Sequence, residues 1–125
     1  MKNIFITLED VIIDVHGVPR PNANQFIKDL VGLEHKIYIW SDLGIEYARR
    51  VHEKLGLPEV HGFMLRGGID RQSIDYVIDC NPTFMKRYPG VCIPEWNSED
   101  LSEDNKNRAA IQFSKIVKKV IEEFG

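Results

Sequence analysis

Three short apolar runs, each followed at once by polar residues, constrain the fold of this chain more than any other feature. The runs cover residues 3–6, 36–40 and 76–78, and the polar residues that follow them are Thr7, Glu9 and Asp10, then Ser41 and Asp42, then Asp79 and Cys80. Continuous apolar runs of this length are typical of strands buried on both faces of a parallel sheet. Because the carboxyl ends of parallel strands meet at one edge, we expect these polar side chains to gather there.

Amphipathic segments separate the apolar runs. Helices are predicted over residues 22–31, 43–55 and 103–124, with a short helix from Pro82, and further strands over 60–65 and 91–93. Asn22 is predicted to cap the first helix, and Ser41 or Asp42 the second. Strands that alternate with helices imply βαβ crossovers. The predicted fold class is therefore α/β, a three-layer Rossmann-like sandwich with a mostly parallel sheet.

Composition narrows the class of protein. A chain of 125 residues with 43% hydrophobic content suits one domain over residues 1–125. Its C-terminal amphipathic helix, from about 103 to 124, would pack on the sheet or form a homodimer seam. A net charge of −3 gives no electrostatic reason to expect nucleic acid or an anionic membrane as a partner. With no signal-like or membrane-spanning apolar run, a cytoplasmic location is expected.

Neither cysteines nor histidines predict a zinc site or a disulfide framework. Cys80 and Cys92 are too few and lack metal-ligand spacing, so both are expected to be reduced thiols. The four histidines are scattered along the chain. Phe5, Tyr38 and Trp40 are predicted to be core residues. Trp96, next to polar residues, is predicted to be half exposed.

The order of these motifs resembles that of the haloacid dehalogenase-like (HAD) phosphohydrolases of the small capless type. In that family the first strand ends in Asp-x-Asp-Gly-[Thr/Val], where this chain has Thr7-Leu8-Glu9-Asp10-Val11. The second strand of the family ends in Ser or Thr, matched by Ser41, and the next helix closes with Leu-Gly-Leu, matched by Leu55-Gly56-Leu57. A later strand ends in two acids, often before Asn-Pro, matched by Asp79-Cys80-Asn81-Pro82. The resemblance covers residues 3 to about 96 and implies an HAD-like fold.

The departures from the family pattern predict that most catalytic carboxylates are lost. Thr7 replaces the aspartate that attacks phosphorus and binds Mg²⁺, and a neutral hydroxyl is a poor ligand for that ion. Glu9 replaces the acid–base aspartate with a carboxyl about an ångström further out. Of the later acid pair only Asp79 is left, because Cys80 takes the second position.

The residue that supplies the positive charge on the phosphate side of the site also differs from the family pattern. The family has a lysine there, and this chain has no obvious match for it. Arg66 and Arg71 are the candidates to supply the charge, as a planar fork in place of a point charge.

The candidate site that follows from the resemblance consists of Thr7, Glu9, Ser41, Arg66, Asp79 and Cys80, with Asp79 and Glu9 as weak Mg²⁺ ligands. The preferred hypothesis is a domain with little or no phosphatase turnover that retains a phosphate-type pocket in a binding or regulatory role. Its ligand would be a phosphate-containing small molecule or a phosphoprotein. One alternative is an active Mg²⁺-dependent phosphomonoesterase, a phosphatase or nucleotidase, with an altered site. The other is a structural dimerisation module.

A second alignment of the first motif is open at this point. Asp14-Val15-His16-Gly17-Val18 also looks like the family signature and would keep the nucleophilic aspartate. It leaves little chain before Pro21 for the turn and hairpin that the family places there, and it leaves residues 3–6 without a role. The alternatives without a binding role are that Ser41 and Asp42 only cap a helix and that Glu9 and Asp10 only form a turn.

Overall fold

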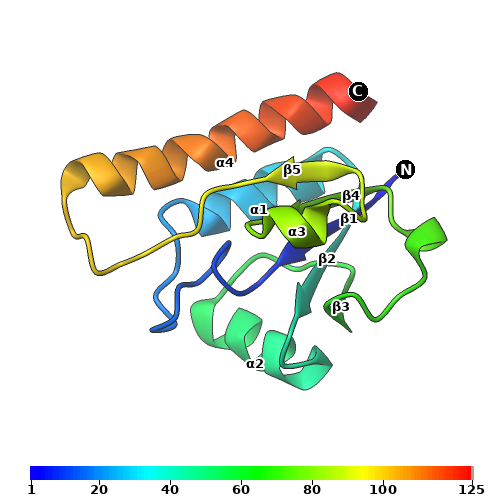
Figure 1. Cartoon of the computed structure of the whole chain (residues 1–125), viewed down its shortest axis with the longest axis horizontal. Coiled ribbons are helices and arrows are strands. Elements are labelled where there is room, and N and C mark those ends of the chain that lie inside the picture. The colour runs from blue at the N-terminus through cyan, green and yellow to red at the C-terminus, as the bar shows by residue number, and fades with distance from the viewer. Residues whose placement is uncertain (125) are drawn as a thin grey trace.

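A computed structural model describes residues 1–124 and shows a five-stranded sheet in which every strand pairing is parallel. The strands are β1 (Asn3–Thr7), β2 (Lys36–Ser41), β3 (Gly62–Leu65), β4 (Tyr76–Asp79) and β5 (Gly90–Cys92), in the spatial order β3-β2-β1-β4-β5. The α-helices are α1 (Ala23–Gly32), α2 (Ile45–Leu55), α3 (Pro82–Met85) and α4 (Glu103–Phe124), and a 3₁₀ turn, η1, covers Arg71–Ser73. The α/β class and the parallel sheet are confirmed (Figure 1).

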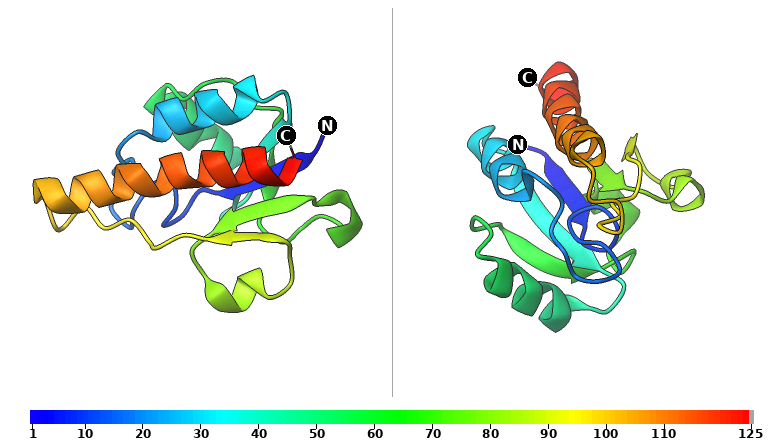
Figure 2. Two further views of the ribbon diagram at one scale, coloured as in Figure 1. Left: turned by 90° about the horizontal axis from the view of Figure 1, so that it is seen from above. Right: turned by 90° about the vertical axis from the view of Figure 1, so that its left-hand side faces the viewer.

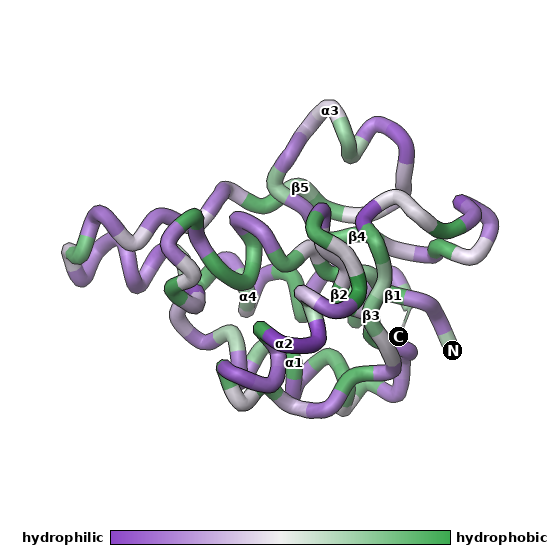
Figure 3. The backbone as a smooth tube through the Cα atoms, turned by 90° about the horizontal axis from the view of Figure 1, so that it is seen from below, coloured by the Kyte–Doolittle hydropathy of each residue, from purple (hydrophilic) through white to green (hydrophobic). Residues whose placement is uncertain are grey.

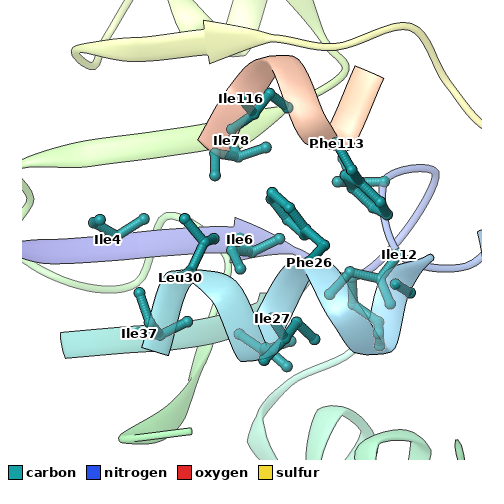
Figure 4. Packing of buried hydrophobic residues seen from close by; sticks show 14 of the residues in the cluster. Ile4, Ile6, Ile12, Phe26, Ile27, Leu30, Ile37, Ile78, Phe113 and Ile116 are labelled. Atoms are coloured by element: carbon teal, nitrogen blue, oxygen red, sulfur yellow. The ribbon is translucent and has the colours of Figure 1, made fainter. Parts of the chain in front are cut away.

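The three longer helices lie on one face of the sheet. Figure 2 shows α1, α2 and α4 on that side, with α3 on the other. Apolar side chains of alternate strand positions meet them in one buried cluster: Ile4, Ile6, Ile37, Ile39, Tyr76 and Ile78. Phe26 of α1 stacks on Phe113 of α4 with 4.0 Å between the ring centroids (Figure 4). This contact fixes the last helix of the chain against the first.

The amphipathic stripe of α4 is used inside the fold. Its buried residues are Ala109, Phe113, Ile116 and Val120, at the spacing expected for one helix face. Polar and apolar residues alternate along the helix (Figure 3). Packing on the fold is therefore the role of this stripe, while Ile111 and Ile121 are apolar residues exposed elsewhere on the helix. None of the helices in the described part of the chain combines the length and the apolar composition that a membrane crossing requires.

The opposite face of the sheet carries a thinner, largely aromatic layer. Phe5, Trp40, Val77 and Ile74 form its buried centre, and α3 together with the segment 66–75 covers them. That segment connects β3 to β4 with only the three-residue turn η1, and Gly67 and Gly68 near its start disfavour a longer helix. This face therefore depends on ring packing and not on a full helical layer.

Two expectations about helix starts need correction. Helix α2 begins at Ile45 with Gly44 as its N-cap, so neither Ser41 nor Asp42 caps it. The hydroxyl of Ser41 instead accepts a hydrogen bond from the amide of Leu43 at 3.0 Å, within the turn before the helix. Asn22 does precede α1, but it lies in the left-handed region (φ 66°) and its side chain makes no capping bond.

Trp96 is buried, so the half-exposed position predicted for it is wrong. Only 5% of its surface is exposed. Its indole nitrogen donates to the carbonyl of Val18 at 3.0 Å, and its amide donates to the carbonyl of Asp10 at 2.8 Å. These bonds join the segment after β5 to the loop after β1, a long-range contact that neighbouring polar residues do not reveal.

Gly90 is a position where the fold excludes a side chain. A Cβ there would lie 2.6 Å from the amide nitrogen of Val77 and closer still to its carbonyl oxygen, and Gly90 has a φ of +147°. We expect Gly90→Ala to lower the free energy of unfolding by about 3 kcal/mol, measured by urea denaturation. Gly32→Ala is the matched control, since nothing lies within 4 Å of its added Cβ. It should be neutral or stabilising by up to about 1 kcal/mol. Equal effects of the two changes would contradict the close β4–β5 pairing.

Candidate functional site

The parallel sheet brings the predicted polar residues to one edge. Thr7, Ser41 and Asp79 are the last residues of β1, β2 and β4, and Arg66 directly follows β3. The three strand residues are almost completely buried, with exposed fractions of 2%, 0% and 0%. Polar groups buried to this extent need hydrogen-bond partners, and the structure supplies them from within the same cluster.

Arg66 makes a two-point ion pair with Asp79. Its Nε donates to Oδ2 of Asp79 at 2.9 Å and its Nη2 donates to Oδ1 at 3.2 Å. The third guanidinium nitrogen, Nη1, donates to Oδ1 of Asp42 at 3.2 Å. The guanidinium carbon also lies 3.7 Å from the ring centroid of Phe84, a cation–π contact. Arg66 is therefore fixed by two carboxylates and one aromatic ring.

The carboxylate of Asp79 is fully occupied. Besides the two bonds from Arg66, its Oδ2 accepts from the hydroxyl of Thr7 and its Oδ1 accepts from the amide of Asn81 at 2.8 Å. Burial raises the pKa of Asp79, but the hydrogen bonds from Arg66, Thr7 and Asn81 outweigh it, so that the pKa is lowered overall. Because the folded-state pKa lies below the unfolded value, this group stabilises the fold above about pH 4, and that stabilisation is lost as the pH falls.

Thr7 is held in one orientation from both sides. The indole nitrogen of Trp40 donates to Oγ1 of Thr7 at 2.8 Å, and the hydroxyl proton of Thr7 goes to Asp79. Trp40 and Phe5 are core residues, as predicted, but the polar role of Trp40 was missed from the sequence. The position of Trp40 in the sequence could have indicated this role. A buried tryptophan needs an acceptor for its N–H, and Thr7 is the residue that pairs with Trp40 in the register of β1 and β2.

Glu9 fills the hydrogen-bond donors at the end of β2. The hydroxyl of Ser41 donates to Oε2 of Glu9 at 2.5 Å, and the amide of Asp42 donates to Oε1 at 3.3 Å. Glu9 itself is only half-buried. The hydroxyl and amide that a bound anion would use thus already hold an anion that belongs to the chain.

The other candidate residues lie outside this network. Cys80 is half-buried, and burial together with the neighbouring charge of Asp79 raises the pKa of its thiol to about 11, so the thiol is neutral at physiological pH. Arg71 lies in η1 and is exposed. Of the two arginine candidates, the structure therefore places only Arg66 in the cluster.

Asp14, the nucleophile of the alternative alignment, anchors a loop. Its carboxylate accepts hydrogen bonds from the amides of Val18 at 2.9 Å, His16 at 3.0 Å and Ser98 at 2.9 Å. Burial raises the pKa of Asp14, but a hydrogen bond from the Ser98 hydroxyl and the three amide bonds outweigh it and lower the pKa to about 2. Asp14 shares none of these partners with Thr7, whereas Thr7 contacts Asp79 directly.

The hydrogen bonds of this edge leave no free carboxylate oxygen on Asp79 for a Mg²⁺ ion. Magnesium demands near-octahedral oxygen ligands, and no group of three or more His, Cys, Asp or Glu side chains in residues 1–124 is arranged to hold a metal. Asp79, the carboxylate expected to bind it, is saturated by Arg66, Thr7 and Asn81. The positive charge beside Asp79 comes from Arg66.

Titration with Mg²⁺ tests this view of Asp79. We expect a dissociation constant weaker than about 1 mM by calorimetry, because the ion would have to displace Arg66 and give up tightly held water. Ca²⁺ serves as the matched ion, with the same charge and a less demanding geometry, and it should also bind weakly. Micromolar binding of Mg²⁺ would contradict the proposed saturation of Asp79.

The Arg66–Asp79 pair can be tested by a double-mutant cycle. Arg66→Met leaves a buried carboxylate without its counter-ion and should cost about 3–5 kcal/mol in unfolding free energy. Asp79→Asn in the same chain should recover about 2 kcal/mol of that loss, because the uncompensated charge is gone. Arg71→Met is the control and should change stability by less than about 0.5 kcal/mol. Strictly additive effects of the two site changes would show that the pair is not coupled.

Comparison of the chain with protein-family models, with curated proteins and with solved structures found no significant match. The family resemblance of the motifs is thus an interpretation of residue order and spacing alone. The structure adds an α/β fold with a five-stranded all-parallel sheet, and a polar edge built from the ends of its strands.

Proposed function

We propose that this chain is a phosphohydrolase-like binding domain without catalytic turnover, in which the chain fills its own site. The observation that carries the proposal is the pairing of Asp79, Arg66 and Glu9 at the carboxyl edge with groups of the same chain. Arg66 supplies the cation beside Asp79, and the carboxylate of Glu9 supplies the anion on the Ser41 hydroxyl and the Asp42 amide. The proposed role is binding or regulatory, through a phosphate group that displaces Glu9.

The chemistry of the site argues against turnover. The hydroxyl of Thr7 donates a hydrogen bond to Asp79, and the lowered pKa of Asp79 makes it a weak base that does not activate the hydroxyl. Cys80 carries a neutral thiol, which is a poor nucleophile. The carboxylate ligands that would place a metal on a phosphate ester are replaced by hydroxyl and thiol groups. The edge therefore contains donors for an anion without a group that attacks it.

A phosphate monoester matches the donors that Glu9 now occupies. Ser41 ends β2 and Asp42 follows it, and donors at such strand ends commonly bind phosphate. Arg66 lies beside them, held to the exposed Asp42 by an ion pair that solvent weakens. Because Glu9 is only half-buried, it can rotate into solvent while the backbone keeps its place. A phosphate-containing small molecule or a phosphoprotein would bind in this way.

Removal of the internal anion tests the proposal. We expect Glu9→Ala to strengthen binding of inorganic phosphate and of phosphoserine by about tenfold, because an intramolecular competitor is gone. Chemical-shift titration of the Ser41 and Asp42 amides measures it. Glu53→Ala, which removes an exposed carboxylate from α2, is the control and should change affinity less than twofold, roughly the effect of a distant surface charge.

Two further results decide the matter. Ser41→Ala in the Glu9→Ala background should abolish the gain in phosphate affinity, since it removes one donor from the pocket. No variant should hydrolyse p-nitrophenyl phosphate with Mg²⁺ present. Mg²⁺-dependent hydrolysis by the unaltered chain would refute the proposal in favour of an active phosphomonoesterase, and unchanged phosphate affinity in Glu9→Ala would remove its main support.

A further inference from the structure

Arg20 is a buried cation that forms no ion pair with an acid in residues 1–124. Only 3% of its surface is exposed. Its Nε donates to the carbonyl of Ala109 at 3.1 Å and its Nη1 donates to the carbonyl of Pro94 at 2.9 Å. The guanidinium carbon lies 5.0 Å from the ring centroid of Phe113.

The guanidinium of Arg20 has donors to spare. A guanidinium carries about five N–H groups, and the two carbonyls use one each, which leaves the Nη2 group unpartnered among the described residues. Burial lowers the pKa of Arg20 to about 10, and the nearby Cys80 raises it to a smaller extent, so the side chain is charged at neutral pH. A buried charge without a counter-ion is costly, and an anion bound at its free donors would reduce that cost.

A pocket lies beside this guanidinium. It has a volume of about 400 Å³ and lies between α4 and the segment that leads from β5 into it, toward the orange end of α4 in Figure 1. Besides Arg20, its wall includes Trp96, Arg108 and Gln112. The amide of Gln112 makes no hydrogen bond with the described residues, and it lies one helical turn from Arg108 on α4.

The acids in the pocket wall limit the charge of an occupant. Glu95 and Asp100 line it together with Arg20 and Arg108. The pKa of Asp100 is lowered by hydrogen bonds from Ser102 and, to a smaller extent, by the charge of Arg108. Arg108 therefore shares its charge with Asp100, while Arg20 has no such partner. Two arginines and two acids line the pocket, so its wall carries no net charge. A dianion would meet repulsion from both acids, whereas a monoanion would meet less of it and could still pair with the free donors of Arg20.

We propose that this pocket binds a small monocarboxylate, with its carboxylate on the free donors of Arg20 and its remaining atoms against Trp96 and Gln112. A planar carboxylate fits the fork of a guanidinium better than a tetrahedral phosphate carrying two charges does here. The site uses none of the donors of the Ser41 edge. Its success or failure in experiment is thus separate from that of the proposed phosphate site.

Acetate is the probe, with acetamide as its uncharged counterpart of the same shape and inorganic phosphate as the dianion. We expect acetate to give saturable chemical-shift changes at the Gln112 side-chain amide, the Arg20 Nε–H and the Ala109 amide, with acetamide and phosphate causing much smaller changes. Acetate should also raise the melting temperature more than chloride at equal ionic strength, because it binds the folded state.

Three variants locate the site. Arg20→Lys keeps the charge but loses the fork and should weaken acetate binding about tenfold or more. Gln112→Ala replaces a helix-surface side chain by a good helix former, so the fold is retained, and it should weaken binding about threefold to tenfold. Arg50→Gln on α2 is the control, because Arg50 is exposed and lies outside the pocket wall. It should change the affinity for acetate by less than about twofold.

Three results would overturn the proposal. Acetate shifts that do not saturate, or that equal those of acetamide, would mean that Arg20 only ties α4 to the loop. Tighter binding of phosphate than of acetate would assign the wrong class of ligand. Acetate affinity that is unchanged in both Arg20→Lys and Gln112→Ala would mean that acetate binds elsewhere.

Discussion

The ion pair between Arg66 and Asp79 is the interaction on which the carboxyl edge of the sheet depends. Asp79 has no exposed surface, and a carboxylate in such a place is tolerated only when its oxygens are paired. Arg66 reaches it from the end of β3 and Thr7 from the end of β1, and Trp40 of β2 holds Thr7. One carboxylate on β4 thus ties four strand ends together. The structural value of this network gives a reason for the cluster to persist without any catalytic role.

The two arginines that are largely withdrawn from solvent show opposite arrangements. The three guanidinium nitrogens of Arg66 donate to Asp79 and Asp42, whose charges reduce its attraction for an outside anion. Arg20 is more deeply buried, yet its partners are two neutral carbonyls. The first guanidinium is thus neutralised by acids of the chain, whereas the second has no ion-pair partner in residues 1–124 and lines a pocket. The same side-chain type therefore supports two distinct proposals, which depend on what surrounds each guanidinium.

Sequence patterns were enough to predict the frame of the fold and part of the site. Apolar runs located β1, β2 and β4, helical spacing located α4 at residues 103–124, and the geometry of parallel strands implied that Thr7, Ser41 and Asp79 would meet. Pairings made by tertiary contacts were beyond reach. The position of Arg66 directly after a predicted strand favoured it over Arg71, but nothing local shows that it pairs with Asp79 or that Glu9 turns toward Ser41. The burial of Trp96 likewise depends on Val18 and Asp10, which are remote in sequence.

The stacking of Phe26 on Phe113 has a consequence for how the chain folds. Helix α1 is synthesised early, but one ring that covers its apolar face belongs to the last helix. Until α4 arrives, the nascent chain displays that face to water, where it can associate with other chains. Contacts of such long sequence separation also slow folding, since the loop must close before the rings can meet. Docking of α4 on α1 is therefore expected to be a late step in the folding of this chain.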